Sequence, residues 1–169
     1  MFYFNQIQIF LIYVTPIRLA ALGNSMEIVN LIMMNPNFIP GPYMFKECTK
    51  ITHINLVPSI KAIDDYSFFG CTSLVEVEIP NSVKSIGKSA FFDCKSLRKV
   101  TIPNSVCEIK RFAFSGCSSL EEIVIPDSVT KLEDYTFNNC SGLTVISMKE
   151  GTTYEKYTFK GSDPRFEYR

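Results

Sequence analysis

Apolar residues recur along this chain at one fixed interval, which its cysteines mark most clearly. A cysteine occurs in each of five successive periods, with a phenylalanine three positions before it and an aliphatic side chain three positions after it; the cysteines are Cys48, Cys71, Cys94, Cys117 and Cys140. A fixed period of about 20 to 50 residues is typical of repeat proteins, in which each repeat is one supersecondary unit. The pattern therefore predicts a linear stack of similar units, with the phenylalanine and cysteine positions inside.

The clearest unit runs from Leu74 to Lys95. It opens with aliphatic side chains at the spacing L-x-x-L-x-L, whose alternation predicts a short strand with one buried face: Leu74, Val77 and Ile79. Pro80 has no N–H for a strand ladder and ends this strand, and the polar pair Asn81-Ser82 predicts a turn. Three small or apolar residues then follow at intervals of four and predict a short helical turn: Ile86, Ala90 and Cys94.

One such unit cannot fold alone, because its few apolar side chains do not offset the conformational entropy that ordering the whole unit costs. Stacked units bury apolar side chains against both neighbours, so stability grows with their number. We therefore expect an α/β repeat solenoid. It should have one short parallel strand per turn, spaced about 4.8 Å from the next, and short helical or irregular segments on the convex side.

The register divides the chain into three parts. Residues 45–148 follow the period, residues 1–44 are expected to be degenerate N-terminal repeats or a cap, and residues 149–169 a C-terminal cap and tail. Residues 1–17 carry no charge; they form either a structural strand or cap, or the remnant of a targeting or anchoring segment. In the last part, Phe159 is expected to plug the core and Gly161–Arg169 to be a loose tail.

Composition narrows the possible partners. Lys and Arg together number 17, as do Asp and Glu, so the net charge of zero gives no support to a nucleic-acid partner. The apolar run near the N-terminus is too short for an integral membrane span. Because five of the six cysteines share the repeat register, we expect buried free thiols rather than disulfides or zinc ligands, and an exposed thiol at Cys107.

We find no set of residues that would perform catalysis. His53 is the only histidine, and no nucleophile shares its register. The carboxylate pairs Asp64-Asp65 and Glu121-Glu122 are adjacent in sequence and do not face one another as catalytic carboxylates do. No glycine-rich phosphate loop is present. We therefore predict no enzyme activity and no catalytic, cofactor-binding or metal-binding residues.

The outward positions of the predicted strands are the candidate binding site. Side chains between the buried ones should form columns on the concave face, in which acidic and basic residues alternate around the third strand. The candidate protein-binding residues are Glu76, Glu78, Arg98, Lys99, Thr101, Glu121 and Glu122. Two interpretations stay open: cross-strand charge pairing that avoids like-charge repulsion, and a mixed-charge recognition strip. A second mixed column, of Asp65, Lys88, Arg111 and Asp134, is interpreted as a solvated flank.

The repeat resembles the BspA-like leucine-rich repeat family. The residues that carry the resemblance, within 45–146, are Ile79-Pro80-Asn81-Ser82-Val83, Ser85-Ile86-Gly87, Ala90-Phe91, Cys94, Leu97 and the segment Ser115–Leu120. The resemblance implies a leucine-rich repeat solenoid that binds proteins without catalysis. It also implies a surface or secreted location and adhesion to a protein ligand such as a host or extracellular matrix protein. The alternative is an intracellular, cytoplasmic scaffold of the same architecture, which the free thiols favour.

Overall fold

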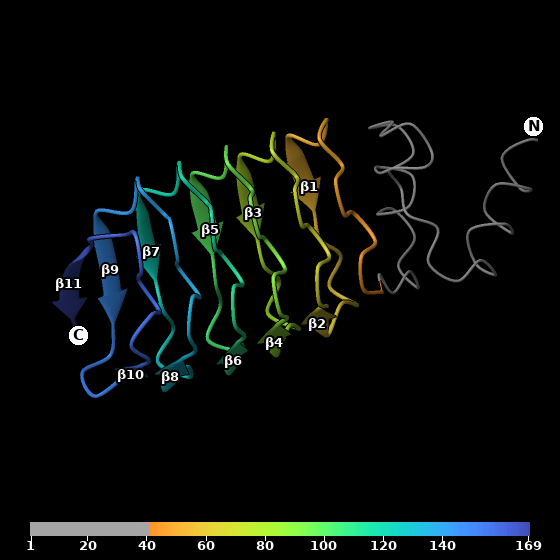
Figure 1. Cartoon of the computed structure of the whole chain (residues 1–169). Helices are drawn as coiled ribbons and strands as arrows, with labels where there is room; N and C mark the ends of the chain where they lie inside the picture. Colours follow the sequence, from red (N-terminus) through yellow and green to blue (C-terminus); the bar gives the residue numbers. More distant parts are fainter. Residues whose placement is uncertain (1–40) are drawn as a thin grey trace, which may run out of the picture.

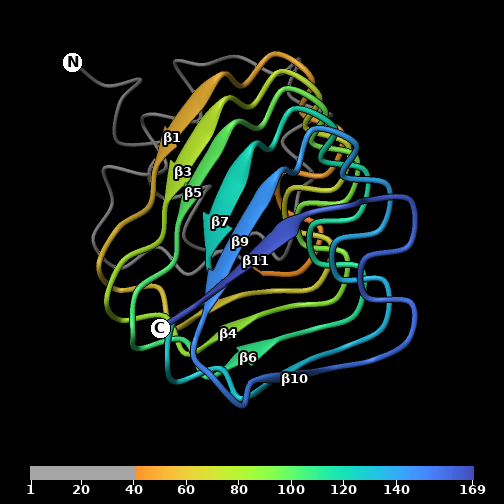
Figure 2. The ribbon, with the colours of Figure 1, turned by 90° about the vertical axis from the view of Figure 1, so that its left-hand side faces the viewer.

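The computed structural model describes residues 41–169, which wind into a flattened coil with parallel strands on its sides (Figure 1). The cross-section of the coil has three sides, formed by a column of longer strands, a column of shorter strands, and a turn-rich side (Figure 2). The expectations for residues 1–40, including the N-terminal strand, cap or targeting segment, lie outside the described residues.

The longer strands repeat once per coil and define the first side. They are β1 (His53–Asn55), β3 (Glu76–Glu78), β5 (Lys99–Thr101), β7 (Glu122–Val124), β9 (Val145–Met148) and β11 (Arg165–Tyr168). They pair in parallel in the orders β1-β3-β5 and β7-β9-β11, and up to β9 each residue lies opposite its equivalent in the next repeat, as Val77 lies opposite Val100. The sequence period therefore sets the register of the sheet.

A second strand in each coil is shorter and was not expected from the sequence. These strands are β2 (Ala62–Ile63), β4 (Ser85–Ile86), β6 (Glu108–Ile109), β8 (Lys131–Leu132) and β10 (Thr153–Tyr154). They also pair in parallel, in the orders β2-β4-β6 and β8-β10. In most of these two-residue strands one apolar side chain points inward, as that of Ile86 does. Strands therefore bound the core of the coil on two of its sides.

The interior is a ladder of phenylalanine rings beside a ladder of cysteines. Phe45, Phe68, Phe91, Phe114 and Phe137 are stacked with centroids 4.9, 5.1, 5.2 and 5.5 Å apart, and each is at most 1 % exposed. The five in-register cysteines are buried and carry free thiols. Four of the thiols donate to the carbonyl of the phenylalanine in the preceding coil, as Cys117 does to Phe91 at 3.2 Å. Both predicted core columns are confirmed.

The third side is made of turns, and no helix occurs in residues 41–169. The helical part of the predicted α/β class is therefore not confirmed, and the irregular alternative describes this side. Except in the last coil, the chain turns twice on this side through residues with positive φ, for example Ser89 at 52° and Asp93 at 56°. Bonds from Ala90 N to Gly87 O and from Cys94 N to Phe91 O close the turns. Two tight turns thus place Ile86, Ala90 and Cys94 on one side, as a helix would have done.

The C-terminal segment is more ordered than a tail. Phe159 is half-buried and continues the ring ladder, with its centroid 5.8 Å from that of Phe137. Beyond Gly161, however, β11 pairs with β9 along Arg165–Tyr168, so the expectation of a loose tail is wrong there. Phe166 packs against the core and supplies the apolar contact that ties this strand down.

Candidate protein-binding face

The outward side chains of the longer strands form one continuous surface, which we call the long-strand face. In β3, Glu76 and Glu78 are exposed on either side of buried Val77, and the other three-residue strands repeat this pattern. The predicted columns are observed: the register places His53 beside Glu76 and Glu76 beside Lys99. All seven candidate residues are exposed; five lie in the strands, while Arg98 and Glu121 directly precede β5 and β7, and the role of all seven in binding stays a proposal.

Most charges of the long-strand face have no ion-pair partner among the described residues. Two contacts at ion-pair distance lie on this part of the surface within residues 41–169: Arg165 Nη2 to Glu167 Oε1, at 2.6 Å within β11, and His53 Nε2 to Glu76 Oε1, at 4.0 Å, which is an ion pair only when the imidazole is protonated. Glu78, Arg98, Lys99 and both residues of the Glu121-Glu122 pair form no ion pair within 4.0 Å there. Opposite charges thus lie in register on neighbouring strands without close ion pairs, and both interpretations, cross-strand charge pairing and a recognition strip, stay open.

A shallow groove of about 170 Å³ crosses the N-terminal half of the face. Its walls are polar side chains from β1, β3 and β5, among them Asn55, Glu78 and Thr101. Val124, one strand further on, is 51 % exposed. Our sequence analysis did not single out Val124, although its column (Asn55, Glu78, Thr101) is otherwise polar and an apolar residue there could have been noticed.

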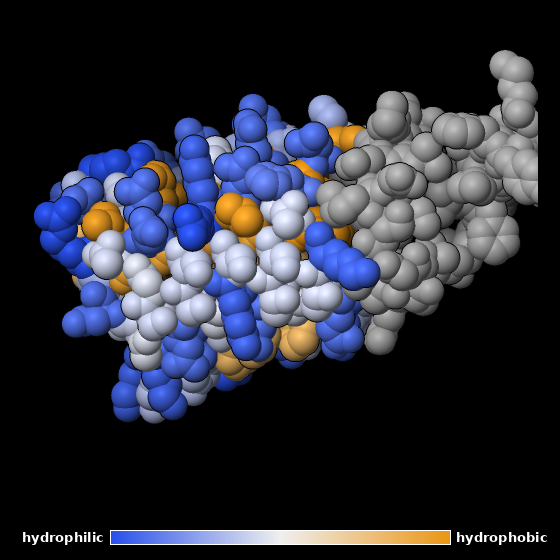
Figure 3. All heavy atoms as spheres, turned by 90° about the horizontal axis from the view of Figure 1, so that it is seen from above, coloured by the Kyte–Doolittle hydropathy of each residue, from blue (hydrophilic) through white to orange (hydrophobic). Residues whose placement is uncertain are grey.

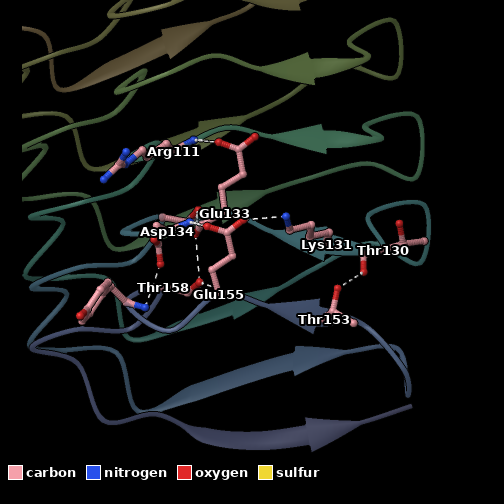
Figure 4. A network of polar contacts seen from close by, with 10 residues as sticks. Arg111, Thr130, Lys131, Glu133, Asp134, Thr153, Glu155 and Thr158 are labelled. Carbon is pink, nitrogen blue, oxygen red and sulfur yellow. Dashed lines mark hydrogen bonds and ion pairs between the residues drawn. The ribbon is translucent and has the colours of Figure 1, made fainter.

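The opposite flank uses its carboxylates to bind the backbone. The N–H of Lys88 donates to Asp65 at 2.7 Å, and that of Arg111 donates to Glu133 at 2.8 Å. Figure 4 shows the same arrangement one coil further, where the Glu155 carboxylate accepts from the Asp134 N–H at 3.2 Å. These contacts join one coil to the next, so the mixed charge column predicted as a solvated flank also has a structural role.

Glu155 also meets Lys131 across the two coils, at 2.6 Å (Figure 4). The hydrogen bond from Lys131 lowers the pKa of the Glu155 carboxyl, and the bond to Glu155 raises the pKa of Lys131. On the short-strand side, the pair thus links β8 to the last coil of the described residues.

An aromatic ladder that the sequence analysis missed runs along the turn-rich side. Its rings contact one another from coil to coil at centroid distances of 4.9 to 6.4 Å, and they are Tyr43, Tyr66, Phe69, Phe92, Phe112, Tyr135 and Tyr157. The ladder could have been predicted from aromatic residues that share one position of the repeat, namely Tyr43, Tyr66, Phe112 and Tyr135. Most of these rings stack on a neighbouring ring, so the ladder stabilises the stack, while Tyr43 and Tyr157 at its two ends stay exposed.

The buried cysteines of the ladder are expected to be unreactive thiols. Burial raises the pKa of Cys48 to about 11 and that of Cys140 to about 12, and it raises the pKa of Cys71, Cys94 and Cys117 still further. A thiol reacts as its thiolate, so these side chains act as small apolar core residues. Among the six cysteines, Cys107 alone is exposed, as its position outside the register indicates.

Two other classes of site, metal-binding and membrane-spanning, find no support in residues 41–169. Residues 41–169 contain no cluster of three or more His, Cys, Asp or Glu arranged to hold a metal. Within the same residues, no helix has the length and apolar character needed to cross a membrane. Seen from above, the surface is mostly polar, and its apolar residues are scattered rather than gathered into one patch (Figure 3).

Comparison with known proteins identifies the repeat. The family described as BspA type leucine rich repeat region matches residues 39–164 in six copies. No curated protein sequence matches the chain significantly.

Three solved structures of bacterial proteins are similar over most of the chain. A leucine rich repeat protein of T. pallidum has 26 % identity and a TM-score of 0.63, over 77 % of this chain and 65 % of that protein. A leucine rich cell surface protein of Faecalibacterium prausnitzii has 29 % identity and a TM-score of 0.61, over 76 % of this chain and 32 % of that protein. A leucine-rich repeat protein of Bacteroides ovatus has 25 % identity and a TM-score of 0.59, over 75 % of this chain and 39 % of that protein. The chain thus matches less than two thirds of each of these proteins.

Proposed function

The chain belongs to the BspA-type leucine-rich repeat family, and from that premise we propose that it binds a protein ligand through the long-strand face. Repeats of this family generally serve as binding modules rather than catalysts. The observation that carries the proposal is the row of exposed charges along β3, β5 and β7, most of which have no ion-pair partner within residues 41–169. A surface that only stabilised the stack would pair these charges across neighbouring strands.

Adhesion to an extracellular protein is the form of this function that we propose, with the protein displayed at a cell surface or secreted. The support is the likeness to the F. prausnitzii cell surface protein, at 29 % identity. The alternative, an intracellular scaffold, is favoured by the six free thiols, because oxidising surroundings usually convert paired cysteines to disulfides. Five of these thiols are buried in separate coils, which weakens that argument.

A charge-reversal variant tests the binding face. Arg98→Glu combined with Lys99→Glu makes three neighbouring strands acidic, so a ligand that fits the wild-type pattern meets repulsion there. The matched control is Lys88→Glu with Arg111→Glu, which reverses two exposed cations on adjacent coils of the opposite flank. Both pairs of residues are exposed, so far-UV circular dichroism should be unchanged in both variants.

Binding is measured against a panel of purified extracellular matrix proteins by surface plasmon resonance. We expect at least a tenfold loss of affinity in the Arg98, Lys99 variant and little change in the flank control. Equal affinity of wild type and the Arg98, Lys99 variant for every bound ligand would remove the long-strand face from consideration. Surface labelling of intact cells with an amine-reactive probe decides the location: a protein that stays unlabelled beside a labelled surface control is not displayed there.

A further inference from the structure

The charges of the long-strand face are sorted into bands that follow the strands. The bands are acidic on β3, basic at the start of β5 and acidic at the start of β7: Glu76 and Glu78, Arg98 and Lys99, Glu121 and Glu122. Each band lies on one coil, so the sign changes once per coil along the stack axis. A ligand that lies along this axis meets acidic, basic and acidic side chains in turn.

The bands are open to a ligand. All six side chains are exposed, and only Glu76 has an ion-pair partner, the His53 ring at 4.0 Å, among residues 41–169. Lys99 thus lies between the equivalent residues Glu76 and Glu122, and Arg98 between Val75 and Glu121, and neither cation closes an ion pair to these neighbours. An approaching chain with the opposite order of charges can contact each band without first breaking an internal pair.

The spacing of the bands selects the shape of that chain. Phe68, Phe91, Phe114 and Phe137 lie 5.1, 5.2 and 5.5 Å apart from one coil to the next, and strand spacing is about 4.8 Å. The two acidic bands are therefore about 10 Å apart, with the basic band midway. An α-helix rises about 1.5 Å per residue, so residues i, i+4 and i+7 on one face lie at about 0, 6 and 10.5 Å.

An extended chain fits less well. Its side chains return to the same face every two residues, or about 6.6 Å, so its third charge would lie about 13 Å from its first. It would also cross the strands of the solenoid and could not add to their hydrogen-bond ladder. A helix keeps all three charges within the reach of flexible Glu, Lys and Arg side chains.

We propose that the long-strand face binds an α-helix of the protein ligand that lies along the stack axis. On the side turned to the solenoid, the helix carries a cation, an anion and a cation at i, i+4 and i+7. This inference rests on the proposed function and names the part of the ligand that is recognised. Val124, exposed at the edge of the second acidic band, provides an apolar contact for the end of such a helix.

Synthetic peptides test the order of charges. Probe one is an alanine-based helical peptide with Lys, Glu and Lys at i, i+4 and i+7; probe two has Glu, Lys and Glu at the same positions; probe three keeps the composition of probe one in the order Lys, Lys, Glu. Fluorescence anisotropy at low salt should give at least tenfold tighter binding of probe one than of either other probe. Similar affinities for all three probes, or no measurable binding of probe one, would overturn the inference.

A swapped surface tests the same claim from the protein side. The variant reverses all three bands and should prefer probe two to probe one; its substitutions are Glu76→Lys, Glu78→Lys, Arg98→Glu, Lys99→Glu, Glu121→Lys and Glu122→Lys. Unchanged preference would contradict the proposal. The smaller Arg98→Glu, Lys99→Glu variant should lose binding of probe one even if the six-residue variant does not fold, while Lys88→Glu with Arg111→Glu should keep it.

The helical shape is tested separately from the charges. A version of probe one with proline in each turn cannot form the helix, and it should bind at least tenfold more weakly. If a matrix protein binds in a manner that depends on Arg98 and Lys99 while the peptides show no preference, the proposed binding function stands and the helical ligand is wrong. If neither depends on these two residues, both proposals fail.

Discussion

Removing one ring of the interior ladder should destabilise the whole stack. Phe91 is 0 % exposed, and its ring lies between those of Phe68 and Phe114 at 5.1 and 5.2 Å. Phe91→Ala therefore removes a fully buried aromatic side chain together with two ring contacts. Substitutions of this kind lower the free energy of unfolding by about 3–5 kcal/mol, and two rigid neighbours that cannot close the cavity favour the upper half of that range.

The adjacent residue is a matched control. Phe92 is half-buried in the outer ladder, with rings at 4.9 Å (Phe69) and 6.4 Å (Phe112). Because part of its side chain already meets water, Phe92→Ala should cost about 1 kcal/mol. Both variants replace phenylalanine by alanine, at adjacent positions, so the difference between their unfolding free energies reports the difference in burial.

Urea denaturation followed by circular dichroism measures both costs. The slope of the unfolding transition must agree between variants, since partial unfolding of a repeat stack would change it. A loss below about 1 kcal/mol for Phe91→Ala, or a loss at least as large for Phe92→Ala, would refute the claim that the in-register phenylalanine column is the interior of the coil.

Three further predictions concern the turns and the thiols. Gly116→Ala should lower the free energy of unfolding by at least about 1 kcal/mol in thermal denaturation, because φ at Gly116 is 78° and the added Cβ would collide with the Asp93 carboxylate. Adding Asp93→Gly should recover part of the lost stability, and no recovery would argue against that contact. A thiol-reactive chromogenic reagent should modify one cysteine of the native protein at pH 8, and Cys107→Ser should abolish the reaction, whereas several reactive thiols would place the cysteine column at the surface. Burial raises the pKa of Cys48 from 9.0 to about 11 and that of Cys140 to about 12 in the folded chain. The free energy of unfolding should therefore fall as the pH rises from 9 toward 12, by up to about 1.4 kcal/mol per pH unit and thiol. An unchanged urea midpoint between pH 7.5 and 10.5 would contradict this.

The repeat period was enough to predict the parallel stack, the buried columns and the register of the charged face. Each of these follows from residue identity at equivalent positions: Phe91 lies inside because Phe68 and Phe114 lie inside, and Lys99 lies beside Glu76 because one repeat makes one coil. Periodicity fixes such relations without any knowledge of the path of the chain between the equivalent positions.

The path of the chain between equivalent positions was predicted less well, because a helical turn was expected there. Spacings of four residues at Ile86, Ala90 and Cys94 suit a helical turn, but the structure reaches the same burial with turns through left-handed residues. The left-handed position alternates between glycine and a larger residue from coil to coil (Glu47, Gly70, Asp93, Gly116, Asn139, Gly161). Only half of these positions are glycine, so the usual signal for positive φ was diluted.

The strand at the C-terminus was missed for a related reason. The last coil is shorter than the others: Arg165 lies opposite Val145, where the regular period would have placed Tyr168. The period therefore no longer marks this strand. The absence of an ion pair at Arg98 and Lys99 within the described residues also depends on side-chain directions, which the order of residues does not specify. For this reason the two interpretations of the charged columns, cross-strand pairing and a recognition strip, could not be separated from the sequence.

Photo-crosslinking tests most directly whether the long-strand face is where the ligand binds. A benzophenone amino acid replaces Val124 on the face in one variant and Lys88 on the opposite flank in another, and each is irradiated with a matrix protein that the wild type binds. We predict a covalent adduct from position 124 and none from position 88. An adduct from position 88 with none from position 124 would contradict the account.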